Sequence, residues 1–325
     1  MTDHPRIAVL DDYQGIATEL ADWTGLPGEV IVFTEPFPGP DEVVAALAGF
    51  DVLVAMRERT RFPAEVLERL PGLRLLVTTG PANAAINLGA ARRLGITVSA
   101  TGYDSSPTAE LTWALILAAA RDLPAEVERV RTGRWQESVG IGLHGKILGL
   151  LGLGRVGSRV ARIGQAFGMH TIAWSPNLTH EKAAEHDVRA VGKHELFATA
   201  DVVSIHLVLS GRTHGIVAAA ELAAMKSTAM LVNTSRGPIV DTPTLLAALR
   251  ERRIAGAALD VYDAEPLPAD DPLRTTPGLL ATPHIGYVTR DLYTTFYRDA
   301  VEDIAAFLNG TPVRVLTAPD DRPPS

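Results

Sequence analysis

The sequence contains no cysteine, which excludes disulfides, thiolate catalysis, cysteine-ligated zinc and iron–sulfur clusters. Positive charge is also scarce: 30 Lys and Arg against 38 Asp and Glu give a net charge of -8. This balance disfavours a nucleic-acid partner, which normally needs a basic face to neutralise phosphates. The longest apolar run, Leu111 to Ala120, contains a Thr and a Trp and is too short to span a bilayer.

The N-terminus lacks the basic region and long apolar stretch of a signal peptide. We therefore expect a cytoplasmic protein without a membrane or nucleic-acid partner. Neither the Asp11–Asp12 pair nor His180, His186 and His194 show convincing metal-ligand spacing, so we expect no metal site.

A chain of 325 residues is long enough for two domains. Short apolar, β-branched runs alternate with Ala/Leu-rich helical patterns, which predicts an α/β fold with parallel sheets. The first series of expected strands is Arg6–Leu10, Glu29–Phe33, Val52–Ala55, Leu73–Thr78 and Ile96–Ser99. The second series is Ile147–Leu151, Thr171–Trp174, Val202–Leu207, Met230–Asn233, Ala257–Val261 and Leu279–Ala281.

Helical patterns lie between the strands, for example at Asp41–Leu47, Ala64–Leu70 and Thr242–Glu251. A long one, Pro107–Arg131, separates the two series, and another, Thr289–Leu308, follows the second. The Pro- and Asp-rich end, Thr317–Ser325, is expected to be disordered.

The second series opens on a glycine motif, with Gly152, Gly154 and Gly157 spaced as Gly-x-Gly-x-x-Gly between an apolar strand and a helical pattern. In a dinucleotide site the first glycine permits the tight turn, the second lets the backbone approach a pyrophosphate, and the third lets helix and strand pack closely. The N–H groups and dipole of the helix start favour the phosphates. A purely structural turn is the alternative.

The next strand should be followed by an acidic residue that binds the adenosine ribose. Ser175 stands there instead, with Asn177 close behind. A neutral residue removes the repulsion against a 2′-phosphate, so NADP is as plausible as NAD at this stage.

Three polar residues follow strands of the second series: Arg236, Glu265 and His284. Ligands of open α/β sheets bind at the carboxyl ends of strands, which brings these residues towards one crevice. A guanidinium can hold a substrate carboxylate, an imidazole can give a proton to a developing alkoxide, and a carboxylate can orient the imidazole. These are the needs of hydride transfer to a 2-keto acid, although each residue alone could be an ordinary loop residue.

Together, Gly152–Gly157, Asn233–Gly237, Leu259–Pro266 and Thr282–Gly286 closely resemble the D-isomer-specific 2-hydroxyacid dehydrogenases. The segments Thr78–Asn83 and Thr108–Glu110 extend the match. The resemblance implies two Rossmann/flavodoxin-like domains with a cleft between them. It places a discontinuous substrate domain at 1–103 and 288–325 and a dinucleotide-binding domain at 104–287.

The resemblance also implies roles for individual residues. Arg236 binds substrate, His284 is the acid/base, and Glu265 is its partner. Arg57, Thr79 and Gly80 join Arg236 on the substrate side, with the Thr79–Gly80 loop offering backbone N–H groups to the carboxylate. The cofactor-side residues are Gly152, Gly154, Arg155, Val156, Gly157, Ser175, Asn177, His206, Thr234, Ser235, Asp260 (near the nicotinamide amide), His284 and Gly286.

The resemblance further implies a homodimer through the cofactor domain, with Arg134–His144 as a candidate arm. Two rival functions stay open. One is a phosphite dehydrogenase, which keeps an Arg/Glu/His set; the other is a nucleotide-sensing protein similar to the C-terminal-binding-protein corepressors. A formate dehydrogenase is disfavoured because such enzymes pair the His with Gln, whereas Glu265 stands here.

Overall fold

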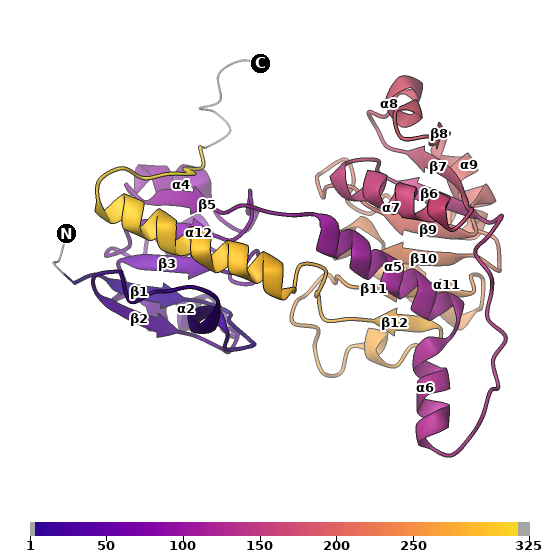
Figure 1. Ribbon diagram of the computed structural model, residues 1–325, viewed down its shortest axis with the longest axis horizontal. Helices are drawn as coiled ribbons and strands as arrows, with labels where there is room; N and C mark the ends of the chain where they lie inside the picture. Colours follow the sequence, from indigo (N-terminus) through magenta and orange to yellow (C-terminus); the bar gives the residue numbers. More distant parts are fainter. Residues whose placement is uncertain (1–3, 318–325) are drawn as a thin grey trace. The chain divides into compact units, whose positions relative to one another are not determined.

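The structure is a computed structural model that describes residues 4–317. The chain divides into two compact units: unit 1 runs to Asp104 and resumes at Val288, and unit 2 spans Ser105–Tyr287. Each unit is a parallel sheet with helices packed against it (Figure 1). The expectation of an α/β fold with parallel sheets is confirmed. The expected disorder of Thr317–Ser325 falls, after Thr317, outside the described residues.

Unit 1 is built on a five-stranded sheet in the order β2-β1-β3-β4-β5. A layer formed by α2, α3 and α4 packs on one face through an aliphatic core that includes Leu47, Leu67 and Ala90. Two helices, α1 and α12, contact each other, and α12 also contacts β4. The bounds are β1 Arg6–Val9, α1 Ala17–Leu20, β2 Glu29–Val32, α2 Pro40–Leu47, β3 Val52–Ala55, α3 Ala64–Leu67, β4 Leu75–Thr78, α4 Leu88–Arg93, β5 Thr97–Ala100 and α12 Arg290–Leu308.

Unit 2 is built on a seven-stranded sheet in the order β12-β11-β10-β9-β6-β7-β8. Its strands are β6 Ile147–Leu151, β7 His170–Trp174, β8 Arg189–Ala190, β9 Val202–Ile205, β10 Met230–Asn233, β11 Gly256–Leu259 and β12 Leu279–Ala281. Its helices are α5 Ser106–Ala120, α6 Leu123–Arg131, α7 Arg155–Ala166, α8 His180–Ala184, α9 Lys193–Thr199, α10 Ala219–Ala224 and α11 Thr242–Arg250.

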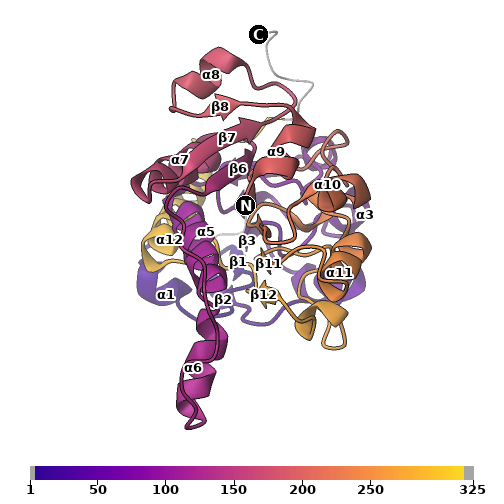
Figure 2. The ribbon, with the colours of Figure 1, turned by 90° about the vertical axis from the view of Figure 1, so that its right-hand side faces the viewer.

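Two apolar cores, one on each face, hold the sheet of unit 2 between helices (Figure 2). One joins the strands to α5, α7 and α8. The other joins them to α9, α10 and α11. Strands covered on both faces are apolar throughout, which is why their sequences show runs rather than alternation.

The expected continuous helix over Pro107–Arg131 is wrong. The helix ends at Ala120, and a new one, α6, begins at Leu123 after Asp122, whose φ of 47° is left-handed. Pro124 explains the break, because it has no N–H and its ring would clash with the carbonyl of Ala120 in a continuous helix. The second helix leaves the first and projects with the segment that follows it (Figure 2).

The strand order of unit 2 reverses between β6 and β9. These strands are neighbours, and from them the chain proceeds to β7 on one side and to β10 on the other. Such a switch point opens a crevice at the carboxyl ends of the strands, where ligands of α/β proteins bind. No helix within residues 4–317 is long and apolar enough to cross a bilayer.

Candidate active site

The glycine motif forms the turn from β6 to α7, at the switch point. Gly152 has a φ of 106°, and a Cβ there would lie 2.7 Å from the carbonyl oxygen of His206, which follows β9. A Cβ on Gly157 would lie 2.2 Å from the carbonyl oxygen of Gly152. Both positions therefore require glycine, because a side chain would collide with the neighbouring backbone.

Gly154 differs from both. Its φ of -90° is ordinary for any residue, and a Cβ there would meet no described atom within 4 Å. It is the N-cap of α7, and no side chain caps that helix. The space beside Gly154, at the N-terminus of α7, is open and therefore fits the approach of a dinucleotide pyrophosphate to the free N–H groups of the helix start. Beside it, Arg155 is exposed at the first helical position, whereas Val156 packs against the core.

The residues that follow β7 lie beside the glycine turn. Ser175 is half-buried and Asn177 is exposed, so both side chains are accessible. The N–H of Gly152 donates to the carbonyl of Trp174 at 2.8 Å, which places the end of β7 beside the glycine turn. The segment from Ser175 to Thr179 contains no carboxylate.

His206 follows β9 on the other side of the turn. Its Nε2 lies 2.9 Å from the hydroxyl of Ser204, and removal of the imidazole from water lowers the pKa of His206 to about 3. The side chain is therefore neutral at working pH. Nearby, the Ser235 hydroxyl donates to the carbonyl of Leu207 at 2.5 Å, and Thr234 shares a hydrogen bond of 2.8 Å with Thr112 of α5.

Arg236 lies in a tight turn after β10. The Asn233 side chain forms this turn: its amide donates to the carbonyl of Arg236 at 2.9 Å, and its oxygen accepts the N–H of Ser235 at 3.0 Å. Next to Arg236, a Cβ on Gly237 would lie 2.1 Å from the carbonyl carbon of Tyr262. The loop that carries Arg236 thus packs directly on the loop after β11.

Glu265 and His284 are in direct contact. The Nδ1 of His284 lies 2.5 Å from Oε2 of Glu265, and the side chains are 21% and 33% exposed. The other carboxylate oxygen, Oε1, accepts the backbone N–H of Tyr262 at 2.8 Å. Since the carboxylate occupies Nδ1, the Nε2 atom of His284 is the one that can exchange a proton with a ligand.

Asp260 fixes the segment around His284, whose own backbone is left-handed with a φ of 54°. Only 1% of Asp260 is exposed. Its Oδ1 accepts the hydroxyl of Thr282 at 2.6 Å and the N–H of Ile285 at 2.8 Å, and its Oδ2 accepts the N–H of Gly286 at 2.8 Å. Burial is the main cause that raises the pKa of Asp260, against the lowering effect of these bonds and of His284. This anchoring of the histidine loop was not apparent from the sequence, because it joins positions more than twenty residues apart.

The substrate-side residues Arg57, Thr79 and Gly80 lie in unit 1, after β3 and β4. The Arg57 guanidinium donates to the carbonyl of Thr79 at 3.0 Å and lies 5.5 Å from the centre of the Tyr103 ring. The expectation that Thr79 and Gly80 offer their N–H groups to a carboxylate needs correction. Both are already donated within unit 1, to the carbonyl of Ala55 at 3.0 Å and to the Thr101 hydroxyl at 2.6 Å.

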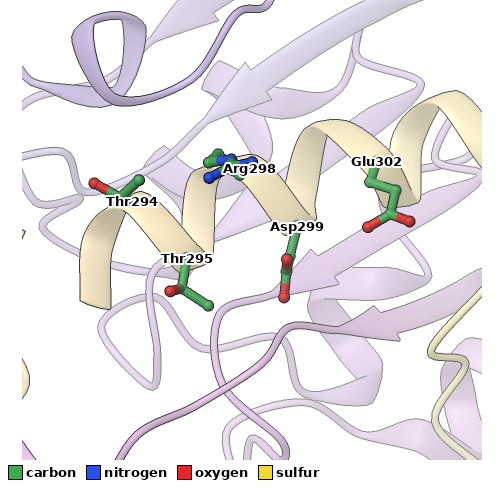
Figure 3. Close-up of a pocket in the computed structure, with 5 residues that line it drawn as sticks. All are labelled: Thr294, Thr295, Arg298, Asp299 and Glu302. Carbon is green, nitrogen blue, oxygen red and sulfur yellow. The ribbon is translucent and has the colours of Figure 1, made fainter. Parts of the chain in front are cut away.

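A polar pocket of about 370 Å³ lies on α12 in unit 1, and Figure 3 shows its five lining residues. It contains none of the residues expected from the sequence. Its acidic side chains serve the protein itself: Asp299 accepts the N–H of Gly102 at 2.7 Å, and Glu302 pairs with Arg314 at 2.9 Å. The residues that the sequence predicts for the site lie elsewhere, and Arg236, Glu265 and His284 follow strands at the carboxyl edge of the sheet in unit 2.

Comparison with known proteins shows the family of the chain. Residues 113–286 match the family described as "D-isomer specific 2-hydroxyacid dehydrogenase, NAD binding domain". The chain is 41% identical over 260 residues to the glyoxylate reductase of Aeropyrum pernix, which covers 77% of this chain and 78% of that protein. The solved structure of a phosphoglycerate oxidoreductase from Vibrio cholerae superposes with a TM-score of 0.89 at 36% identity, covering 94% of this chain and 99% of that one.

The D-3-phosphoglycerate dehydrogenase of Archaeoglobus fulgidus is 35% identical over 277 residues, which cover 84% of this chain and 52% of that protein. This chain thus spans about half the length of that relative.

The fold and the family match define an NAD-binding oxidoreductase, and its glycine turn and the contact between Glu265 and His284 lie at the carboxyl ends of strands of one sheet. The chain belongs to the D-isomer-specific 2-hydroxyacid dehydrogenase family, which acts on small 2-hydroxy and 2-keto acids. The resemblance noted in the sequence is thereby confirmed.

Proposed function

We propose that this enzyme reduces a short 2-keto acid to the D-2-hydroxy acid, and catalyses the reverse reaction, with Arg236, Glu265 and His284 as its catalytic residues. The contact of 2.5 Å between Glu265 and His284, on loops that follow adjacent strands β11 and β12, carries this proposal. Arg236 follows β10, the next strand of the same sheet.

Each residue supplies one requirement of the reaction. Arg236 binds the substrate carboxylate through its planar, permanently charged guanidinium. His284 gives a proton from Nε2 to the carbonyl oxygen as it becomes an alkoxide, and takes it back in the reverse direction. Glu265 fixes the orientation of the imidazole through Nδ1.

The glycine turn, with its open approach at Gly154, and the side chains of Ser175, Asn177 and His206 would hold the nucleotide. When bound, the nicotinamide supplies the hydride. In the proposed assignment, Thr234, Ser235 and Asp260 shape the nicotinamide end through the loops they fix, together with Gly286.

Binding of NADP as well as NAD is part of the proposal. Its support is the accessible Ser175, with no carboxylate before Glu181 to repel a 2′-phosphate or to bind a ribose diol. Lys182, exposed in α8, is the first Lys or Arg after Ser175 along the chain.

Unit 1 is proposed as the substrate domain, with Arg57 as a positive charge for the substrate. The guanidinium is held by the carbonyl of Thr79, and Gly80 lets it lie close, since a Cβ there would sit 1.8 Å from Nη1 of Arg57. A homodimer and a cytoplasmic location also stay predictions.

A substrate panel run with NADH and with NADPH tests the function. Glyoxylate and hydroxypyruvate come first, because the glyoxylate reductase noted above is similar over three-quarters of the chain. Pyruvate and a bulkier keto acid complete this panel, and phosphite is tested in a separate assay with NAD+ and NADP+ as the hydride acceptors. Turnover of a keto acid supports the proposal. Oxidation of phosphite instead would favour the first rival, and nucleotide binding without any turnover would favour a sensor.

A further inference from the structure

We infer that Tyr262 is the positioning residue of this active site, which it organises through its phenol hydroxyl and its backbone. The inference rests on the proposed roles of Glu265 and His284. It assigns a task to a residue that lies between the catalytic ones and that the motifs did not single out.

The phenol hydroxyl is linked to His284 through a single atom. It donates to the carbonyl oxygen of Thr282 at 2.8 Å, and the backbone N–H of His284 donates to the same oxygen at 3.0 Å. The hydroxyl also lies 3.3 Å from the carbonyl of Leu259 at the end of β11. The loop after β12 is thus tied to the end of β11 immediately before the acid–base residue.

The backbone of Tyr262 holds the other catalytic residues. Its N–H donates to Oε1 of Glu265 at 2.8 Å, which leaves Oε2 for His284. Its carbonyl carbon would lie 2.1 Å from a Cβ added to Gly237, so the loop that carries Arg236 packs closely against the backbone of Tyr262. One residue therefore contacts or hydrogen-bonds to the loops of all three catalytic residues.

The hydroxyl suits this task because it stays protonated. Tyr262 is 8% exposed, and burial, followed by the charges of Asp260 and Glu265, raises its pKa to about 12. It therefore remains a hydrogen-bond donor throughout the working range of the enzyme. A donor that never ionises can orient His284 without taking part in the proton transfer.

The substitution Tyr262→Phe tests the inference, since it removes the hydroxyl and keeps the ring that fills the core. We expect kcat for keto-acid reduction to fall about five- to tenfold, which corresponds to the loss of one hydrogen bond. The Kd for NADH, measured by fluorescence, and the KM for the keto acid should stay within about twofold, because neither depends on the proton donor.

Tyr297→Phe is the matched control, because Tyr297 is buried too but lies on α12 in unit 1. It should leave kcat unchanged. If both variants lose kcat equally, Tyr262 contributes only general stability and the inference fails.

A double-mutant cycle with Glu265→Gln separates positioning from structure. If Tyr262 acts through the Glu265–His284 pair, adding Tyr262→Phe to Glu265→Gln should lower kcat by much less than it does in the wild type. The same factor in both backgrounds would overturn the inference while leaving the proposed function intact. An unimpaired Glu265→Gln enzyme would instead contradict the proposed function.

Should Tyr262→Phe not fold, Thr282→Val tests the same loop. It removes the hydroxyl that donates to Asp260 and leaves the carbonyl that Tyr262 contacts. In that variant Tyr262 and the two bonds from the N–H groups of Ile285 and Gly286 to Asp260 still hold the loop, so kcat should stay within about threefold of the wild type. A collapse of kcat would show that the Tyr262 bond does not hold the loop.

Discussion

At the scale of single residues, the three glycines of the β6–α7 turn have two different roles. Gly152 and Gly157 make room for protein atoms, at 2.7 Å and 2.2 Å from an added Cβ. Gly154 makes room for no described atom of the protein. A motif that the sequence presents as one unit therefore combines two packing positions with one that faces the ligand.

The pair Gly154→Ala and Gly157→Ala distinguishes these tasks. Gly154→Ala should keep the melting temperature of the wild type, because the φ of -90° at this position suits any residue. It should weaken the binding of NADH at least about tenfold, which is about 1.4 kcal/mol of binding free energy. Gly157→Ala should destabilise unit 2 by about 1–3 kcal/mol through overpacking. Calorimetry with and without NADH measures both. An unaltered NADH affinity in Gly154→Ala would show that the nucleotide does not approach there.

At the scale of elements, the sequence predicts the buried strands well. Their apolar runs are long and bounded by turns, and each expected strand is present within a few residues of its predicted ends. One observed strand, β8, was not expected, because its two residues, Arg189 and Ala190, are too few to show a hydrophobic pattern. The helix break at Asp122 was missed because the apolar spacing continues through Pro124, although the proline itself was the available signal.

The site, too, could be predicted only where a local sequence pattern indicates it. Arg236, Glu265 and His284 could be named because their residue types and places after strands indicate their chemistry. The engagement of the Gly80 N–H by Thr101, and of Asp260 by the histidine loop, depends on neighbours distant in sequence. No local pattern encodes such pairs, so the sequence led to the wrong partners for the N–H groups of Thr79 and Gly80.

The end of α12 is joined to the segment that follows it, residues 313–316, by the buried carboxylate of Asp303. Arg314 donates to Asp303 at 2.9 Å, while the next residues pair with the edge strand β5. Burial raises the pKa of Asp303 to about 7, and the positive charge of Arg314 offsets this only in part. The folded protein thus binds this proton more tightly than the unfolded chain does, with its value near 3.8.

It follows that the ionised form of Asp303 costs stability, and that the cost grows as pH rises from about 4 to about 7. We expect Asp303→Asn to be more stable than the wild type at pH 8, with a difference that shrinks towards pH 4. Urea unfolding at several pH values measures this. Glu302→Gln is the control, because that side chain is 65% exposed and also pairs with Arg314. A gain independent of pH would contradict the assignment.

At the scale of the whole molecule, an exposed apolar arm indicates self-association. Helix α6 and the residues after it carry exposed apolar side chains: Trp135 is 74% exposed, Val139 98% and Val130 61%. Glu126 ties this arm together by accepting the Ser138 hydroxyl at 2.6 Å and its N–H at 2.9 Å, the bonds that lower the pKa of Glu126 to about 2. An ordered, exposed apolar surface is typical of a protein interface.

We therefore predict a homodimer through α6 and residues 134–144. Light scattering at micromolar concentration should give twice the chain mass of 34.6 kDa. The double variant Trp135→Ser/Val139→Ser should be monomeric, whereas Leu94→Ser, an exposed apolar residue of unit 1, should remain dimeric. A monomeric wild type would contradict this interface.

The central claim, that His284 supplies the proton for reduction of a keto acid, is tested most directly by a single turnover of NADH with His284→Ala and the best acid of the panel. We expect the rate of nicotinamide oxidation to fall by about 10²–10⁴, the usual contribution of a general acid, while NADH still binds. A single-turnover rate close to that of the wild type would contradict the account.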